Sequence, residues 1–171
     1  MAESVPVMSV INIPSGTSPI IQALVDHWLD LHPAPSILPG RQHIDPEALS
    51  RLHKNVLPHI WLLDVEANPR RYRLRLIGSA LTGAGSPGRP GRFLDEVDTT
   101  GVVTERVNPV VDSRRPAFRR GAPVLPHSKA VAELENVYLP LATDGVQVDM
   151  ILACTLYTFR QGATPVNLLL G

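Results

Sequence analysis

The chain has 171 residues, 44% of them hydrophobic, which is enough for one domain with its own core. Its 16 Lys and Arg residues balance its 16 Asp and Glu residues, and this neutrality argues against a protein that holds a polyanion by overall charge. The single cysteine excludes an internal disulfide, and the absence of a long apolar run or a signal-like N-terminus predicts a soluble, cytoplasmic protein that does not enter a membrane.

The first part of the chain predicts an irregular arm followed by an amphipathic helix. Residues 1–17 mix small residues with two prolines and show no sustained period. Ser18 and Pro19 are typical of a helix start, with a capping hydroxyl followed by proline at the first helical position. Pro33 cannot continue a helix, so this one should stop by His32.

The next segment predicts a second, shorter helix and then two strands. Residues 45–47, Asp-Pro-Glu, repeat the pattern of cap, proline and acid, and this helix should end near Pro58. From residue 60 the apolar residues follow a two-residue period. Residues 60–65 and 71–78 therefore predict two strands, joined by a turn at 66–70 that contains Asn and Pro.

The second of these strands, together with Arg70 before it, contains four arginines in the stretch RRYRLRL, residues 70–76. The arginines alternate with apolar residues, which is typical of a strand with one face in water. A basic patch for nucleic acid is the rival interpretation. The alternation predicts Arg71, Arg73 and Arg75 on the solvent side and Tyr72, Leu74 and Leu76 on the inner side.

The middle of the chain predicts mostly loops and helices. Residues 79–91 are rich in glycine and proline and predict a loop, followed by one or two helical turns at 92–97. A longer helix should follow from about residue 101, shortened or kinked by Pro109. A third strand is expected around residues 119–126.

Two apolar runs around Asp144 and Gly145 predict a final hairpin, because this dipeptide favours a two-residue turn. One face of that hairpin would be almost wholly apolar, apart from Glu135, whose carboxylate would need a partner if buried. Pro140 has no N–H and indicates an edge, bulge or bend. The predicted register pairs Leu141 with Val148, Leu139 with Met150, Val137 with Leu152 and Glu135 with Cys154.

Five segments in this order resemble a bacterial PAS-like family of small stand-alone proteins. The likeness covers roughly residues 18–158, and it implies an α+β fold with a five-stranded antiparallel sheet of order 2-1-5-4-3. It also implies helices over one face, an N-terminal flanking helix, one domain at 18–160 and a tail at 161–171. The segments are LPGRQHIDP at 38–46, PHIWLLDV at 58–65, RYRLRLIGSAL at 72–81, GRFLDEV at 91–97 and ENVYLPLATDG at 135–145.

The resemblance and the N-terminal helix together predict self-association. The apolar stripe of this helix is too wide to remain in water, so it must pack on its own sheet or on a second copy. PAS domains often dimerise through such a helix. We therefore expect a two-fold homodimer with Leu24 and Trp28 at the contact.

No cofactor is expected. The Asn-Cys-Arg-Phe motif of flavin-binding PAS domains is missing, and Cys154 lies inside a predicted strand, where a small core residue is the simpler interpretation. Residues 100–118 contain no histidine that could bind haem. The six histidines form no compact metal-binding pattern, and no nucleophile motif or phosphate loop is present.

These observations favour a non-catalytic sensory or regulatory module that binds a small molecule, a protein partner or both. Two alternatives stay open: an enzyme that uses the same cavity, and a nucleic-acid-binding protein that uses the arginines at 70–75 and 114–120. Neutral overall charge disfavours nucleic acid as a partner. The expected ligand-binding residues are Tyr72, Leu74, Leu76, Phe93, Val107, Glu135, Val137, Met150 and Cys154.

Overall fold

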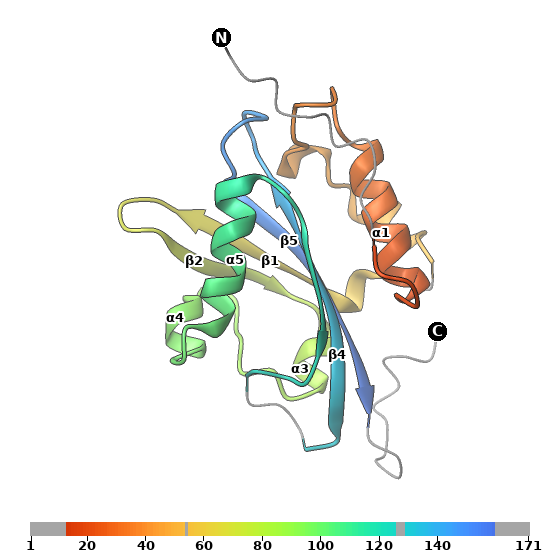
Figure 1. Ribbon diagram of the computed structural model, residues 1–171, viewed down its shortest axis with the longest axis vertical. Coiled ribbons are helices and arrows are strands. Elements are labelled where there is room, and N and C mark those ends of the chain that lie inside the picture. The colour runs from red at the N-terminus through yellow and green to blue at the C-terminus, as the bar shows by residue number, and fades with distance from the viewer. Residues whose placement is uncertain (1–12, 54, 126–128, 160–171) are drawn as a thin grey trace.

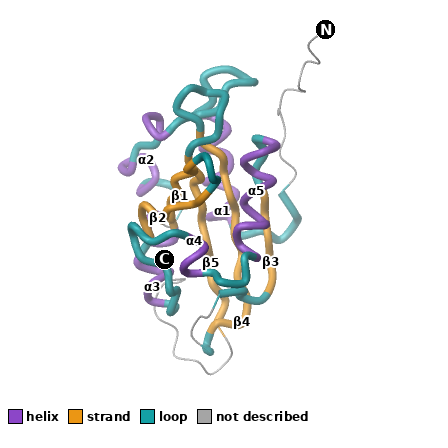
Figure 2. The backbone as a smooth tube through the Cα atoms, turned by 90° about the vertical axis from the view of Figure 1, so that its left-hand side faces the viewer, coloured by secondary structure: helices purple, strands orange, loops and turns teal. Residues whose placement is uncertain are grey.

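A five-stranded antiparallel sheet forms the centre of the molecule. The computed structural model describes residues 13–53, 55–125 and 129–159, so most of the predicted arm and all of the predicted tail at 161–171 lie outside the described residues. The strand order β2-β1-β5-β4-β3 confirms the predicted α+β sheet, with β2 and β3 at its edges (Figure 2). The strands are β1 Ile60–Glu66, β2 Arg71–Ile77, β3 Ala117–Gly121, β4 Val131–Leu141 and β5 Met150–Phe159.

The helices begin largely where the sequence predicts. Ser18 caps the first helix through a hydrogen bond from the Ile20 N–H, and Asp45 caps the second by accepting the Glu47 N–H at 2.9 Å. The second helix ends at Ser50, well before Pro58, and a short helix replaces the loop predicted at 79–83. The helices are α1 Pro19–Asp30, α2 Pro46–Ser50, α3 Ser79–Gly83, α4 Leu94–Val97 and α5 Val102–Ser113, with 3₁₀ turns at Arg41–His43 and Leu57–His59.

Helices cover both faces of the sheet (Figure 1). On one face α1 packs on β4, where the Trp28 indole N–H donates to the Pro140 carbonyl oxygen at 3.1 Å. On the other face lie α3, α4 and α5, and the Tyr72 hydroxyl on β2 bonds the Asn108 side chain of α5. The N-terminal helix therefore covers the face opposite α5.

The position of α1 corrects the predicted dimer contact. Leu24 and Trp28 are both 0% exposed, because they pack into the core of their own chain. A helix that buries its apolar stripe on its own sheet has no need of a second copy to cover it. Placing the dimer contact at these two residues was wrong, and the homodimer itself stays a prediction.

The final hairpin has a longer loop than predicted, and its register differs by two residues. Leu141 pairs with Met150, Val137 with Cys154 and Glu135 with Leu156, so the predicted pairs were wrong. Residues 142–149 form the loop, which is held from outside the hairpin: the Leu38 N–H donates to the Gly145 carbonyl, and the Ala142 N–H donates to the Pro39 carbonyl. A shift of two residues keeps every side chain on its predicted face.

The third strand also begins earlier than predicted. It runs from Ala117 to Gly121 instead of around 119–126, and it pairs with β4 only between Leu134 and Tyr138. Pro140 lies beyond this pairing, at a place where β4 has no neighbour on that side and the missing N–H costs no ladder bond. Of the edge, bulge or bend expected at Pro140, the structure has an unpaired side of β4 at this position.

Strand β2 alternates as predicted up to Arg75, where a bulge interrupts it. Leu74 pairs with Leu63 and Leu76 with Leu62, so Arg75 is the extra residue. A bulge reverses the facing of the residues that follow it. Leu76 is therefore not on the inner side, as predicted, but on the opposite face, where it is 43% exposed.

The arginines of β2 are surface residues with acidic partners. Arg73 bonds Glu66 at 2.9 Å and Arg75 bonds Asp64 at 2.8 Å, in cross-strand pairs with β1. Their side chains are 41% and 56% exposed, which agrees with the predicted solvent-facing side of the strand.

Substitution should separate the two sides of β2. Leu74 is 2% exposed, so Leu74→Ala should lower the free energy of unfolding by about 2 to 5 kcal/mol. Arg73→Gln removes an exposed ion pair and should cost no more than about 1 kcal/mol. Urea unfolding measures both. Equal losses for the two variants would contradict the assignment of Arg73 to the surface.

The start of α5 depends on a buried carboxylate. Asp98 is 3% exposed and accepts the backbone N–H groups of Thr100 and Val103, at 3.1 and 2.7 Å. Burial alone would raise the pKa of Asp98, but hydrogen bonds from the Thr100 hydroxyl and the Val103 N–H outweigh it and lower the pKa.

Replacing this carboxylate should destabilise the protein in a pH-dependent way. Asp98→Ala should cost about 1 kcal/mol at pH 7, as for loss of a helix cap. Because the folded pKa lies below the unfolded value of about 3.9, the stabilisation is present above about pH 4 and is lost as the pH falls through the folded pKa. Asp98→Asn keeps an acceptor without titrating. The difference in unfolding free energy between wild type and Asp98→Asn should therefore decrease as the pH falls below about 4. A difference that stays constant there would refute the role of the Asp98 carboxylate.

Candidate functional site

A cavity lies between the sheet and helices α3, α4 and α5, and we call it the sheet–helix cavity. Its volume is about 70 Å³, whereas one water molecule needs roughly 10 to 15 Å³ by the same measure. It therefore has room for a compact molecule of a few non-hydrogen atoms. Its wall is mostly apolar and includes Leu74, Leu81, Leu94, Val103 and Leu134.

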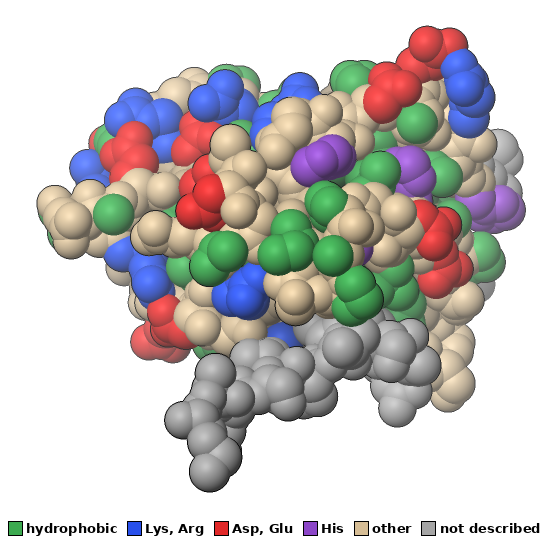
Figure 3. Space-filling model, turned by 90° about the horizontal axis from the view of Figure 1, so that it is seen from above, with side chains coloured by type: hydrophobic (Ala, Val, Ile, Leu, Met, Phe, Trp, Pro, Cys, Tyr) green, Lys and Arg blue, Asp and Glu red, His purple; other side chains and the backbone are tan. Residues whose placement is uncertain are grey.

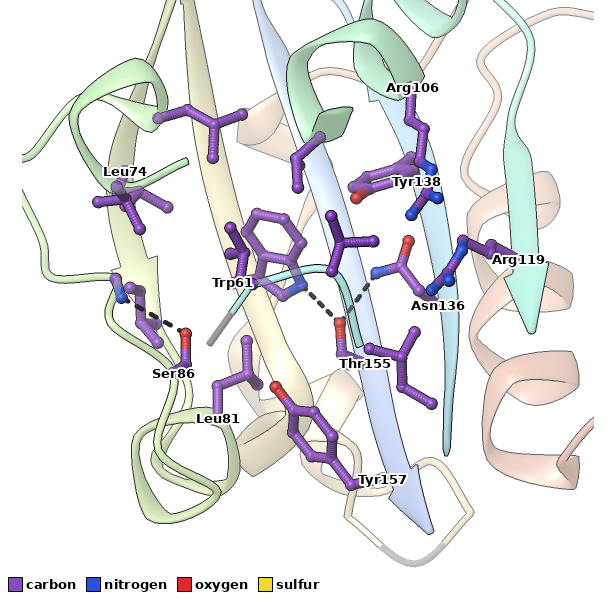
Figure 4. Close-up of a pocket in the computed structure, with 18 residues that line it drawn as sticks. Trp61, Leu74, Leu81, Ser86, Arg106, Arg119, Asn136, Tyr138, Thr155 and Tyr157 are labelled. Carbon is purple, nitrogen blue, oxygen red and sulfur yellow. Dashed lines mark hydrogen bonds between the residues drawn. The ribbon is translucent and has the colours of Figure 1, made fainter. Parts of the chain in front are cut away.

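A polar network crosses the floor of the cavity (Figure 4). The Thr155 hydroxyl oxygen accepts two hydrogen bonds, from the Trp61 indole N–H at 3.0 Å and from the Asn136 amide at 2.9 Å. The Asn136 amide also donates to the Cys154 carbonyl at 3.2 Å, while its side-chain oxygen is buried and has no partner among the described residues. An unpaired buried acceptor is uncommon in folded proteins and marks this wall as a place for a hydrogen-bond donor.

Two arginines reach the cavity from different elements. Arg106 descends from α5 and Arg119 points inward from β3, and both guanidinium groups end near Tyr138 and Asn136 (Figure 4). Burial and the positive charge of Arg106 together lower the pKa of Arg119. Burial raises the pKa of the Tyr138 hydroxyl, which therefore stays neutral and can donate. This end of the cavity is rich in donors and positive charge.

The structure does not bring the predicted ligand-binding residues together around one cavity. Leu74 lines the sheet–helix cavity. Tyr72 on β2 and Val107 on α5 are buried but do not line the sheet–helix cavity. Phe93 lies against the guanidinium groups of Arg71 and Arg73, at 3.5 and 4.3 Å from its ring centre.

The other predicted residues belong to the opposite face. Glu135 accepts the Ser18 N–H at 3.0 Å and lies 3.6 Å from Arg120, so its carboxylate helps to anchor the start of α1. Cys154 is fully buried opposite Val137, and burial raises the pKa of its thiol, which agrees with a core residue. Met150 is buried at the start of β5, on the parity of Cys154.

The polar residues of the cavity were missed because sequence reasoning favoured the other parity of the last two strands. A signal was present: Asn136 and Thr155 are polar residues whose neighbours two positions away in each strand are Leu, Ala and Tyr, and the structure pairs them directly. Buried polar residues in a strand need partners, so such a pair predicts a network or a ligand. Arg119 lies in the arginine cluster that was considered for nucleic acid.

The exposed arginines offer no continuous basic surface in the described parts of the chain. Seven of these arginines each have a carboxylate within ion-pair distance. In the view from above, basic and acidic side chains lie beside one another (Figure 3). Mixed charges of this kind give little attraction for a phosphate backbone.

Residues 13–53, 55–125 and 129–159 contain no cluster of three or more His, Cys, Asp or Glu side chains placed to hold a metal ion. In the same residues, no helix has the length and apolar character needed to cross a bilayer. Comparison of the chain with protein-family models, with curated proteins and with solved structures finds no match in any of the three. We therefore infer function from the geometry of the cavity.

Proposed function

We propose that the protein is a non-catalytic, PAS-type sensory module that binds a small molecule in the sheet–helix cavity. The observation that carries this proposal is a mostly apolar cavity beneath α5, with a few convergent polar groups, which is the usual character of a small-molecule site. The strand order 2-1-5-4-3, with α3, α4 and α5 over the face of the sheet that carries the cavity, supports the PAS assignment. We place the protein in the cytoplasm.

The side chains that line the cavity favour binding over catalysis. Among the described residues, the lining contains no histidine, cysteine or carboxylate that could act as nucleophile or general base. The Thr155 hydroxyl accepts two hydrogen bonds and has no base beside it, so it is poorly suited to attack a substrate.

A ligand in this cavity could be sensed at the surface through β3 and α5. Arg119 belongs to β3, the edge strand, and Arg106 belongs to α5, so one ligand would contact two elements that also face outward. A ligand changes the conformation of a protein only through different affinities for its states. We propose that ligand binding shifts β3 or α5 and so alters contact with a protein partner.

Filling the cavity should block binding. Val103→Phe adds a ring to the cavity wall and should abolish binding of the neutral probe 1-butanol. Binding is measured from changes in backbone amide chemical shifts when 1-butanol is added at millimolar concentration. Leu76→Phe adds the same ring on the opposite face and should leave the binding unchanged. In wild type, the shifted amides should cluster around Leu81, Leu134 and Tyr157.

Shifts that are absent, or that persist in Val103→Phe, would refute the cavity as the binding site. Urea unfolding of Val103→Phe checks that the variant is folded. Overpacking a filled core costs about 1 to 3 kcal/mol, and the free volume should reduce that cost.

A further inference from the structure

The two arginines that line the sheet–helix cavity differ from most other arginines that the structure describes, although Arg41, Arg89, Arg114 and Arg115 also have no carboxylate partner there. In the described residues, Arg51, Arg70, Arg71, Arg73, Arg75, Arg92 and Arg120 each have a carboxylate within ion-pair distance. Arg106 and Arg119 have none there, although both reach a cavity with an apolar wall.

Among the described residues, no carboxylate forms an ion pair with either of these arginines. Arg119 donates from one nitrogen to the Ala122 carbonyl at 2.5 Å, which leaves its other N–H groups available. The buried carboxylate of Asp98 accepts hydrogen bonds from Thr100 and Val103, and it forms no ion pair with any residue that the structure describes. Two neighbouring cations beside apolar walls are stabilised by an anion placed between them.

The neighbouring amide adds a second requirement. The buried oxygen of Asn136 has no partner, while its nitrogen is already used by Thr155 and the Cys154 carbonyl. The Cys154 carbonyl can only accept a hydrogen bond, so the Asn136 atom that lies 3.2 Å from it is the nitrogen, and the other atom is the oxygen. The ligand should therefore carry a donor as well as an anionic group.

We propose that the ligand is a short-chain hydroxycarboxylate. Its carboxylate binds Arg106 and Arg119, its hydroxyl donates to the Asn136 oxygen, and its short alkyl chain lies toward Leu81 and Leu134. Arginine suits a carboxylate because its planar N–H groups match the two oxygens. The volume of about 70 Å³ limits the chain to a few carbon atoms. This inference rests on the proposed cavity site.

Isothermal titration with four probes tests the chemistry: 2-hydroxybutyrate, butyrate, butyramide and inorganic phosphate. We expect 2-hydroxybutyrate to bind about tenfold more tightly than butyrate, and butyrate about tenfold more tightly than butyramide, as for loss of one hydrogen bond and of one charged contact. Phosphate lacks an apolar part and should bind more weakly than 2-hydroxybutyrate. Equal affinity for butyrate and butyramide, or tighter binding of phosphate, would overturn the proposal.

Matched substitutions locate the binding. Arg106→Gln and Arg119→Gln should each weaken 2-hydroxybutyrate binding by about tenfold or more. Arg115→Gln removes an exposed arginine outside the cavity and should leave the affinity unchanged. Thermal unfolding confirms that each variant is folded. An equal loss in all three variants would indicate a general charge effect and would overturn the assignment to Arg106 and Arg119.

Binding of 1-butanol separates this inference from the proposed function. The neutral probe needs the cavity but not the arginines, so Arg119→Gln should still bind it. If 1-butanol binds in the cavity and no carboxylate binds more tightly than butyramide, the anion proposal fails and the cavity site stands. If neither 1-butanol nor any carboxylate binds, both proposals fail.

Discussion

Burial of the β4–β5 ladder on both faces is the constraint on which the rest of the structure depends. Odd-numbered residues of β4, such as Val137, lie toward α1, and even-numbered residues, such as Asn136 and Tyr138, lie toward α5. Both sets of side chains therefore leave water, and each polar one among them needs a partner. The Thr155 hydroxyl and the Cys154 carbonyl accept from the Asn136 nitrogen, but the Asn136 oxygen has no partner among the described residues. This leaves a polar site inside an apolar layer.

The elements and their order could be predicted from local sequence signals. Ser18 and Asp45 mark helix starts because their caps are made within a few residues, and the alternation in 71–75 indicates a strand for the same reason. The hairpin register could not be predicted from Asp144 and Gly145, because contacts with residues 38–39 hold the loop in a longer form. The bulge at Arg75 leaves no sequence pattern of its own.

The cavity itself was only partly predictable. The sequence indicated a space between sheet and helices, and Leu74 does line it. The ligand was expected on the apolar face of β4 and β5 that includes Val137 and Cys154. Side chains of α1, such as Leu24 and Trp28, pack against that face. Which face of a sheet stays partly open depends on where distant helices pack, and no local pattern encodes that.

Three observations in the described residues favour a cavity that holds a small anion: both faces of the sheet are covered, two arginines at the cavity have no carboxylate partner, and one buried amide oxygen has no partner. A high-resolution crystal structure of the protein, purified without added ligand and then soaked with 2-hydroxybutyrate, tests this most directly. We expect electron density for the hydroxycarboxylate beside Arg106, Arg119 and Asn136. A cavity closed by neighbouring side chains, with both guanidinium groups turned out to solvent, would contradict it.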